Sequence, residues 1–124
     1  MILDTCALLW LAHDQSHFTE EILRAFEVSP VNVSAISCFE ISLKHRSGKL
    51  YLPVPPREWF KEITLHHRID IISLDEEICL KAAELAQIHN DPCDRFIIAT
   101  ALIRKLPVVT ADRRFSEYGI QVFL

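Results

Sequence analysis

Short apolar runs alternate with amphipathic segments along the whole chain. Strands are predicted where apolar and β-branched residues cluster, at 1–3, 31–34, 69–72, 107–110 and 120–123. Helices are predicted where apolar residues recur on one face, at 5–12, 19–28, 37–47, 56–66 and 91–105, with another that opens at Ser73. Parallel strands need crossover connections, so this alternation predicts a three-layer α/β/α sandwich around a five-stranded, mainly parallel sheet.

Local signals mark several helix ends. Ser37 and Glu40 have the spacing of a capping box, as do Ser73 and Glu76, which predicts helices that open at these two serines. Gly48 suits the left-handed residue that ends a helix. On this reading Glu40 lies in the first turn of its helix.

Four acidic residues lie where strands end or helices begin. Asp4 and Asp112 follow the first and fourth strands, while Glu40 and Asp94 lie in the first turns of two helices. In a parallel sheet, ligands bind beyond the carboxyl ends of the strands. The four carboxylates are therefore predicted to meet at one edge of the sheet.

Each of these acids alone has an ordinary structural explanation. Asp and Glu near a helix N-terminus act as caps, and Asp is common in turns. Four caps have no reason to share a pocket, however, and close carboxylates repel by about 4 kcal/mol per pair at a moderate effective dielectric. Oxygen ligands of this kind favour Mg²⁺ or Mn²⁺, and two such ions would balance the charge.

Composition is consistent with this interpretation. The 124 residues carry a net charge of −4, and without the four acids the chain has 13 acidic and 13 basic residues. This length predicts a single domain spanning residues 1–124. We expect a soluble, cytoplasmic protein, since no apolar run approaches the roughly 18 residues of a membrane span and no signal-like segment is present.

Other classes of site are disfavoured. The four cysteines have no zinc-like or redox spacing and are predicted to be buried, reduced thiols. Only Gly48 and Gly119 are glycines, and neither lies between a strand and its following helix, which argues against nucleotide phosphate loops. The adjacent pair His66 and His67 points in different directions on a helix, and no histidine has a partner acid suggested by its spacing.

Further residues have two readings each. Thr5 and Thr110 are either caps or residues that orient a carboxylate or water, and Asp91 is an N-cap with a possible role outside the metal's own ligands. Four basic side chains near the acids are either solvated surface charges or contacts for phosphate groups of a ligand: Lys44, Arg95, Arg113 and Arg114.

At these same segments the chain resembles the PIN domain, specifically the VapC-type ribonuclease toxins of bacterial toxin–antitoxin pairs. The resemblance covers essentially the whole chain, and its order and spacing are specific. Phe39 and Cys93 depart from the residues usual in the family, but they affect packing rather than the acids. The matching segments are Leu3-Asp4-Thr5 with Leu8-Leu9-Trp10, Ser37 to Lys44 with Gly48-Lys49-Leu50, Asp91 to Arg95, and Thr110-Ala111-Asp112 with Phe115.

The resemblance implies a sheet in the order 3-2-1-4-5 and an endoribonuclease that uses two Mg²⁺ or Mn²⁺ ions and a metal-activated water. It identifies Asp4, Glu40 and Asp94 with the core metal-binding acids, and Asp112 with a fourth, more variable one. It also implies inhibition by a cognate antitoxin protein, and a homodimer. Two alternatives remain. One is a receiver-type signalling domain, but this chain lacks the acidic pair and the final lysine that such a domain requires. The other is a non-catalytic PIN-like binding module.

Overall fold

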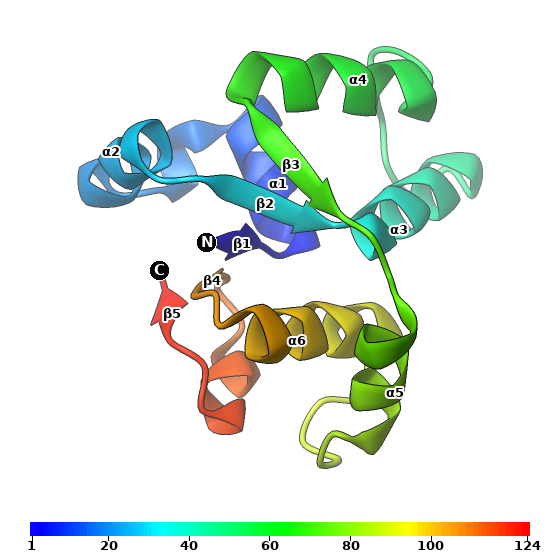
Figure 1. Ribbon diagram of the computed structural model, residues 1–124. Coiled ribbons are helices and arrows are strands. Elements are labelled where there is room, and N and C mark those ends of the chain that lie inside the picture. Colours follow the sequence, from blue (N-terminus) through cyan, green and yellow to red (C-terminus); the bar gives the residue numbers. More distant parts are fainter.

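The computed structural model describes residues 1–124, and strands alternate with helices throughout (Figure 1). All predicted strands and helices are present, and two short 3₁₀ helices, η1 and η2, are added. The elements are β1 (Ile2–Leu3), α1 (Thr5–His13), η1 (Gln15–His17), α2 (Glu20–Val28), β2 (Val31–Ser34), α3 (Ala35–Arg46), α4 (Pro56–His67), β3 (Ile69–Ile72), α5 (Glu76–Glu84), α6 (Pro92–Arg104), β4 (Val108–Val109), η2 (Arg113–Tyr118) and β5 (Val122–Phe123).

The five strands form one sheet in the order β3-β2-β1-β4-β5, and every neighbouring pair is parallel. β1 is central, with Leu3 in register with Val33 on one side and Val109 on the other. This confirms the predicted fold class and strand order. It also excludes the receiver-type alternative, whose doubly wound sheet has the order 2-1-3-4-5.

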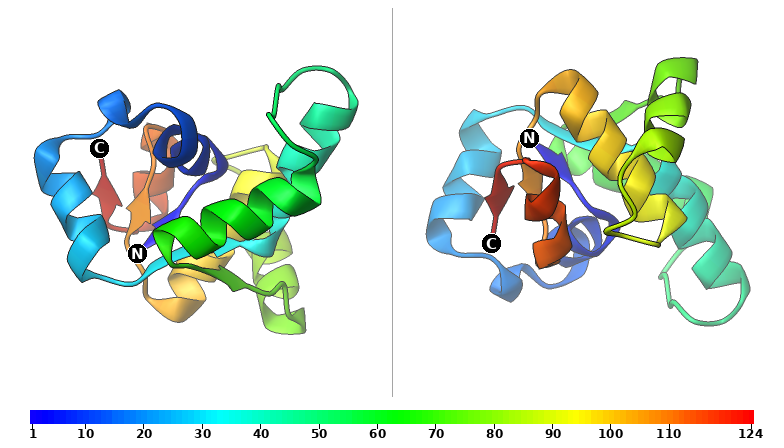
Figure 2. Two further views of the ribbon diagram at one scale, coloured as in Figure 1. Left: turned by 90° about the horizontal axis from the view of Figure 1, so that it is seen from above. Right: turned by 90° about the horizontal axis from the view of Figure 1, so that it is seen from below.

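Helices cover both faces of the sheet and make the outer two layers. α1, α2 and α4 lie on one face, and α5, α6 and η2 lie on the other (Figures 1 and 2). The first face packs Leu8, Trp59 and Phe60 against the sheet, and the second packs Ile97 and Phe115. These buried apolar contacts hold both helix layers on the sheet, and they thereby fix the position of the sheet edge at which the acids lie.

α3 begins three residues earlier than predicted. Its N-cap is Ser34, the last residue of β2, whose hydroxyl accepts a hydrogen bond from the Ile36 N–H at 3.1 Å. Ser37 is inside the helix and fully buried, so the predicted capping box with Glu40 is wrong. Glu40 therefore lies in the second turn. The predicted end is confirmed, since Gly48 follows the helix with a positive φ of 78°.

α5 begins later than predicted. Asp75, not Ser73, is the N-cap, and its carboxylate accepts a hydrogen bond from the Ile78 N–H at 2.9 Å. Carboxylates and hydroxyls are both good caps, and starting at Asp75 places Ile78 and Ala82 in the core.

The prediction that all four cysteines are buried is wrong. Cys6 and Cys79 are exposed, and Cys38 and Cys93 are only partly covered, although all four are free thiols. The helical period turns Cys6 to solvent between the buried Thr5 and Ala7. None of the helices combines the length and apolar composition that crossing a membrane requires.

Candidate metal site at the carboxyl edge of the sheet

Asp4 ends β1 and caps α1. Its Oδ1 accepts a hydrogen bond from the Ala7 N–H at 2.8 Å, and its Oδ2 accepts one from the Thr110 hydroxyl. The residue is only 6% exposed. Burial raises the pKa of Asp4 above its ordinary value; the two hydrogen bonds oppose that rise, and the charges of Asp112 and Glu40 add to it. Asp4 is thus a buried carboxylate whose charge is costly without a cation.

Asp94 is the third residue of α6, as predicted. Its backbone N–H donates to the N-cap carboxylate of Asp91 at 3.1 Å, and its Oδ2 lies 3.0 Å from His89 Nε2. Burial and, after it, the negative charge of Asp91 raise the pKa of Asp94 to about 7, while His89 acts in the opposite sense. This carboxylate is therefore poised to lose its proton when positive charge arrives.

Asp112 is the N-cap of η2 and is already paired. The Arg114 guanidinium donates from Nε to Oδ1 at 3.0 Å and from Nη2 to Oδ2 at 2.8 Å, in the bidentate geometry typical of arginine. His89 Nε2 lies 2.9 Å from the same Oδ2. The hydrogen bonds from Arg114 are the largest cause that lowers the pKa of Asp112 to about 2. Asp112 is ionised at any physiological pH.

Glu40 has a buried carboxylate oxygen that no protein group satisfies. Its Oε2 is 3.3 Å from Lys44 Nζ, one turn along α3, but its Oε1 is buried and has no hydrogen-bond partner. Buried polar atoms are almost always satisfied, and an unsatisfied carboxylate oxygen is costly. A cation at this position removes that cost.

The acids form two close groups rather than one. His89, Asp94 and Asp112 offer ligand atoms within 4.8 Å of one another, and so do Glu40, Asp91 and Cys93. Asp4 belongs to neither group, but its charge contributes to the raised pKa of Asp94, and Glu40 and Asp112 act on Asp4 in turn. All four predicted acids therefore lie at the predicted edge, close enough for their charges to act on one another.

The donors fit a hard divalent cation. Four carboxylates supply oxygen ligands of the kind that Mg²⁺ and Mn²⁺ prefer. Cys93 lies beside Glu40 and Asp91, but burial and then the charge of Glu40 raise the pKa of its thiol to about 11. The thiol stays protonated at neutral pH and is a poor ligand. The sulfur therefore does not change the class of metal.

The two threonines are built into the site. Thr110 donates to Asp4, and its Oγ1 also accepts the N–H of Asp112 at 3.0 Å. Thr5 shares a buried hydrogen bond of 2.9 Å with Ser37, one turn before Glu40. Both contacts hold segments that carry acids.

Of the four basic candidates, Arg95 is not placed to contact RNA. It is 9% exposed, and its guanidinium donates five hydrogen bonds, two to the carbonyl of Ala82 in α5 and three to carbonyls of the α5–α6 connection, so it has no free donor for RNA. Lys44, Arg113 and Arg114 are all exposed, and Lys44 pairs with Glu40. The position of Arg95 next to an acid in the sequence does not reveal its burial.

His89 is the residue of this site that sequence reasoning missed. It is 1% exposed and contacts both Asp94 and Asp112. It lies in the irregular segment between α5 and α6, where neither periodicity nor spacing connects it to an acid. The only local signal is its place two residues before Asp91, whose backbone N–H donates to His89 Nδ1 at 3.1 Å.

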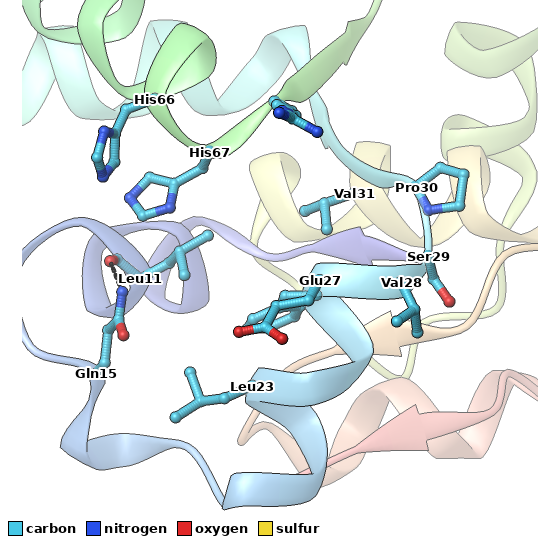
Figure 3. Close-up of a pocket in the computed structure, with 12 residues that line it drawn as sticks. Leu11, Gln15, Leu23, Glu27, Val28, Ser29, Pro30, Val31, His66 and His67 are labelled. Atoms are coloured by element: carbon cyan, nitrogen blue, oxygen red, sulfur yellow. Dashed lines mark hydrogen bonds between the residues drawn. The ribbon is translucent and has the colours of Figure 1, made fainter.

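The other conspicuous histidines are far from the acids. His66 and His67 line a hollow of about 650 Å³ formed by α1, α2, α4 and the start of β2, with Leu11, Leu23 and Glu27 around it (Figure 3). This hollow lies at the amino ends of β2 and β3, the opposite edge of the sheet. Burial lowers the pKa of His67, and the neighbouring His66 adds to the effect. The hollow has no part in the acidic site.

Known structures share the fold along nearly the whole chain. The crystal structure of VapBC2 from Rickettsia felis bound to a DNA fragment from their promoter contains a chain with a TM-score of 0.74 and 14% identity, covering 98% of this chain and 96% of that one. A toxin–antitoxin complex from Klebsiella pneumoniae gives a TM-score of 0.64 at 22% identity, with 99% and 95% covered. At these identities the likeness establishes the fold.

Sequence comparison gives information on the family as well as on the fold. Ribonuclease VapC22 of Mycobacterium tuberculosis is 26% identical over 120 residues, which cover 95% of this chain and 91% of VapC22. Residues 1–121 match the family profile of the PIN domain, and this match spans all four acids. The chain therefore belongs to the PIN domain family.

Proposed function

We propose that this protein is a metal-dependent endoribonuclease that acts as the toxin of a toxin–antitoxin pair. The observation that carries the proposal is the convergence of Asp4, Glu40, Asp94 and Asp112 at one sheet edge, with Glu40 Oε1 buried and unpartnered. The similarity of the chain to a protein named a ribonuclease supports RNA as the substrate.

The four acids would hold Mg²⁺ or Mn²⁺, with Asp4 deepest in the site and two ions as the favoured number. When bound, these ions supply positive charge that polarises a phosphodiester and favours ionisation of an attacking water. Thr110 holds the Asp4 carboxylate in place, and the buried walls around it exclude bulk water. The chain thus needs no serine, cysteine or histidine nucleophile.

Two kinds of partner are proposed, from the solved structures that share the fold and from the positive charges near the site. We propose a cognate antitoxin protein, because two structures with this fold are described as VapBC or toxin–antitoxin complexes. Lys44, Arg113 and Arg114 remain candidates for contact with RNA phosphates, since all three lie beside acids of the site. A homodimer is proposed on family resemblance.

The test is cleavage of structured RNAs by the wild type and Asp94→Asn with Mg²⁺ or Mn²⁺, with EDTA in a parallel series. We expect metal-dependent cleavage by the wild type and a loss of at least about 100-fold in the variant, because a ligand to the ions is removed. Asp70→Asn, an exposed acid on β3, is the matched control. Cleavage that survives EDTA, or that Asp94→Asn retains, rules out the proposal. A wild type that binds metal but cleaves no RNA favours the non-catalytic module.

A further inference from the structure

His89 is held at every polar atom. Its backbone N–H donates to the Tyr118 hydroxyl at 2.8 Å, and its carbonyl accepts from Arg95 Nη1 at 3.0 Å. Phe115 packs edge-on against the ring, with the ring centroids 5.8 Å apart. Tyr118 in turn donates to the carbonyl of Ala86 at 2.7 Å. The imidazole is thus fixed in position and orientation before any ligand binds.

The hydrogen bonds also fix its tautomer. The Asp91 backbone N–H donates to Nδ1 at 3.1 Å, so Nδ1 is an acceptor and carries no proton. The ring proton is therefore on Nε2. That atom lies 3.0 Å from Asp94 Oδ2 and 2.9 Å from Asp112 Oδ2. The Nε2–H donates a hydrogen bond to Asp112 Oδ2, and the Asp94 carboxylate, from another segment of the chain, lies against the same nitrogen.

We infer that His89 is a positioning residue of the metal site, whose Nε2–H holds the Asp112 carboxylate by a hydrogen bond and keeps it beside the Asp94 carboxylate that contacts the same nitrogen. This inference rests on the proposed function. Asp94 contacts His89 through its Oδ2 at 3.0 Å, which leaves its Oδ1 for a cation. Two carboxylates this close repel one another, and the Nε2–H that lies between them offsets part of that repulsion in the absence of metal.

The same geometry excludes the obvious alternative role. One histidine and two aspartates within 4.8 Å have the composition of a transition-metal site. A metal-ligating nitrogen must offer its lone pair, however, and Nε2 carries the proton because Nδ1 is engaged by Asp91. His89 therefore orients two ligands and is not itself a ligand.

Two variants separate this role from simple packing. In His89→Gln the amide nitrogen reaches about as far as Nε2 and still donates to the acids, whereas in His89→Asn the amide reaches only as far as Nδ1. Both keep a polar side chain in the same segment. We expect His89→Gln to bind Mn²⁺ within about 3-fold of the wild type and His89→Asn to bind it about 10- to 100-fold more weakly, as for other residues that orient ligands.

The measurements are Mn²⁺ titration calorimetry, urea unfolding in EDTA, and the ¹⁵N–¹H spectrum of the wild-type histidines with and without Mg²⁺. The spectrum is expected to show an Nε2–H tautomer that persists when Mg²⁺ is added. Loss of the Nε2 proton on binding overturns the inference, and so does equal Mn²⁺ affinity in His89→Asn and the wild type. If both variants lose affinity in step with stability, His89 is only a packing residue. A wild type that binds no metal overturns the proposed function as well.

Discussion

Thr110 donates a hydrogen bond from its hydroxyl to the carboxylate of Asp4, although 106 positions separate them in the sequence. The contact follows from the sheet: Leu3 and Val109 are in register on adjacent parallel strands, so the residues after each strand lie side by side. The same hydroxyl accepts the N–H of Asp112. One threonine therefore connects two of the proposed metal ligands.

Replacing this threonine tests the connection. Thr110→Val keeps the shape but leaves Asp4 Oδ2 and the Asp112 N–H without their partner, so we expect a loss of about 1 to 3 kcal/mol in unfolding free energy. We also expect about 10-fold weaker Mn²⁺ binding, because the carboxylate is no longer oriented. Urea unfolding in EDTA and calorimetry measure the two effects. Thr110→Ser, which keeps the hydroxyl, is the control, and equal behaviour of the two variants would contradict the prediction.

The Arg95 side chain is expected to contribute to the unfolding free energy of the protein. Its guanidinium is buried and donates to the carbonyls of Ala82, Leu85, Ala86 and His89. A lysine has one ammonium group and cannot reach four carbonyls, so Arg95→Lys should lower the unfolding free energy by about 3 kcal/mol.

The matched control for Arg95 is Arg113→Lys, an exposed arginine of the same edge, which should change stability by less than about 0.5 kcal/mol. Urea denaturation of both variants gives the comparison. Equal stability of Arg95→Lys and the wild type would show that the carbonyls do not depend on this side chain.

The raised pKa of Asp94 predicts a pH-dependent stability in the absence of metal. Its pKa is about 7 in the folded protein and 3.8 ordinarily, so the folded state holds a proton that unfolding releases between these values. The stabilising contribution is therefore full below pH 3.8 and is lost as the pH rises through 7. Asp4 acts in the same direction, whereas the lowered pKa of Asp112 adds stability that is full above about pH 4 and is lost as the pH falls through about 2.

Asp94→Asn isolates this effect, because asparagine resembles the protonated acid and does not titrate. In EDTA the variant should match the wild type near pH 4 and exceed its unfolding free energy by about 1 to 2 kcal/mol at pH 8, after allowance for water at the partly exposed carboxylate. Comparing the two proteins cancels the titrating groups that do not interact with Asp94. A constant difference between pH 4 and 8 would argue against a raised pKa.

Much of the fold is visible in the sequence. Apolar runs separated by amphipathic segments predict all strands and helices, and the resemblance supplies the strand order that the structure confirms. The first residue of a helix is harder to predict from the sequence than the helix itself, because several residues near Ser37 and Ser73 are competent caps. Tertiary packing chose Ser34 and Asp75, since those starts bury Ile36 and Ile78.

The site was predictable only where residues follow regular elements. Asp4, Asp94 and Asp112 are placed by the ends of strands and helices, and parallel pairing brings them together. His89 and Arg95 gain their roles from an irregular connection whose path depends on three hydrogen bonds from Arg95 to its carbonyls. No periodicity encodes that path, so a ligand-orienting histidine and a buried arginine went unrecognised.

Divalent metal should stabilise the protein through the acids. Bound Mn²⁺ relieves repulsion among Asp4, Asp94 and Asp112 and satisfies Glu40 Oε1, so the melting temperature should rise with metal concentration. At 100 times the dissociation constant the expected gain is about 2.7 kcal/mol. Asp4→Asn should weaken this response, whereas Asp70→Asn should keep it. Calorimetric scans over millimolar Mn²⁺ measure the shift, and a wild-type melting temperature that does not move would mean that the buried acids tolerate one another without a cation.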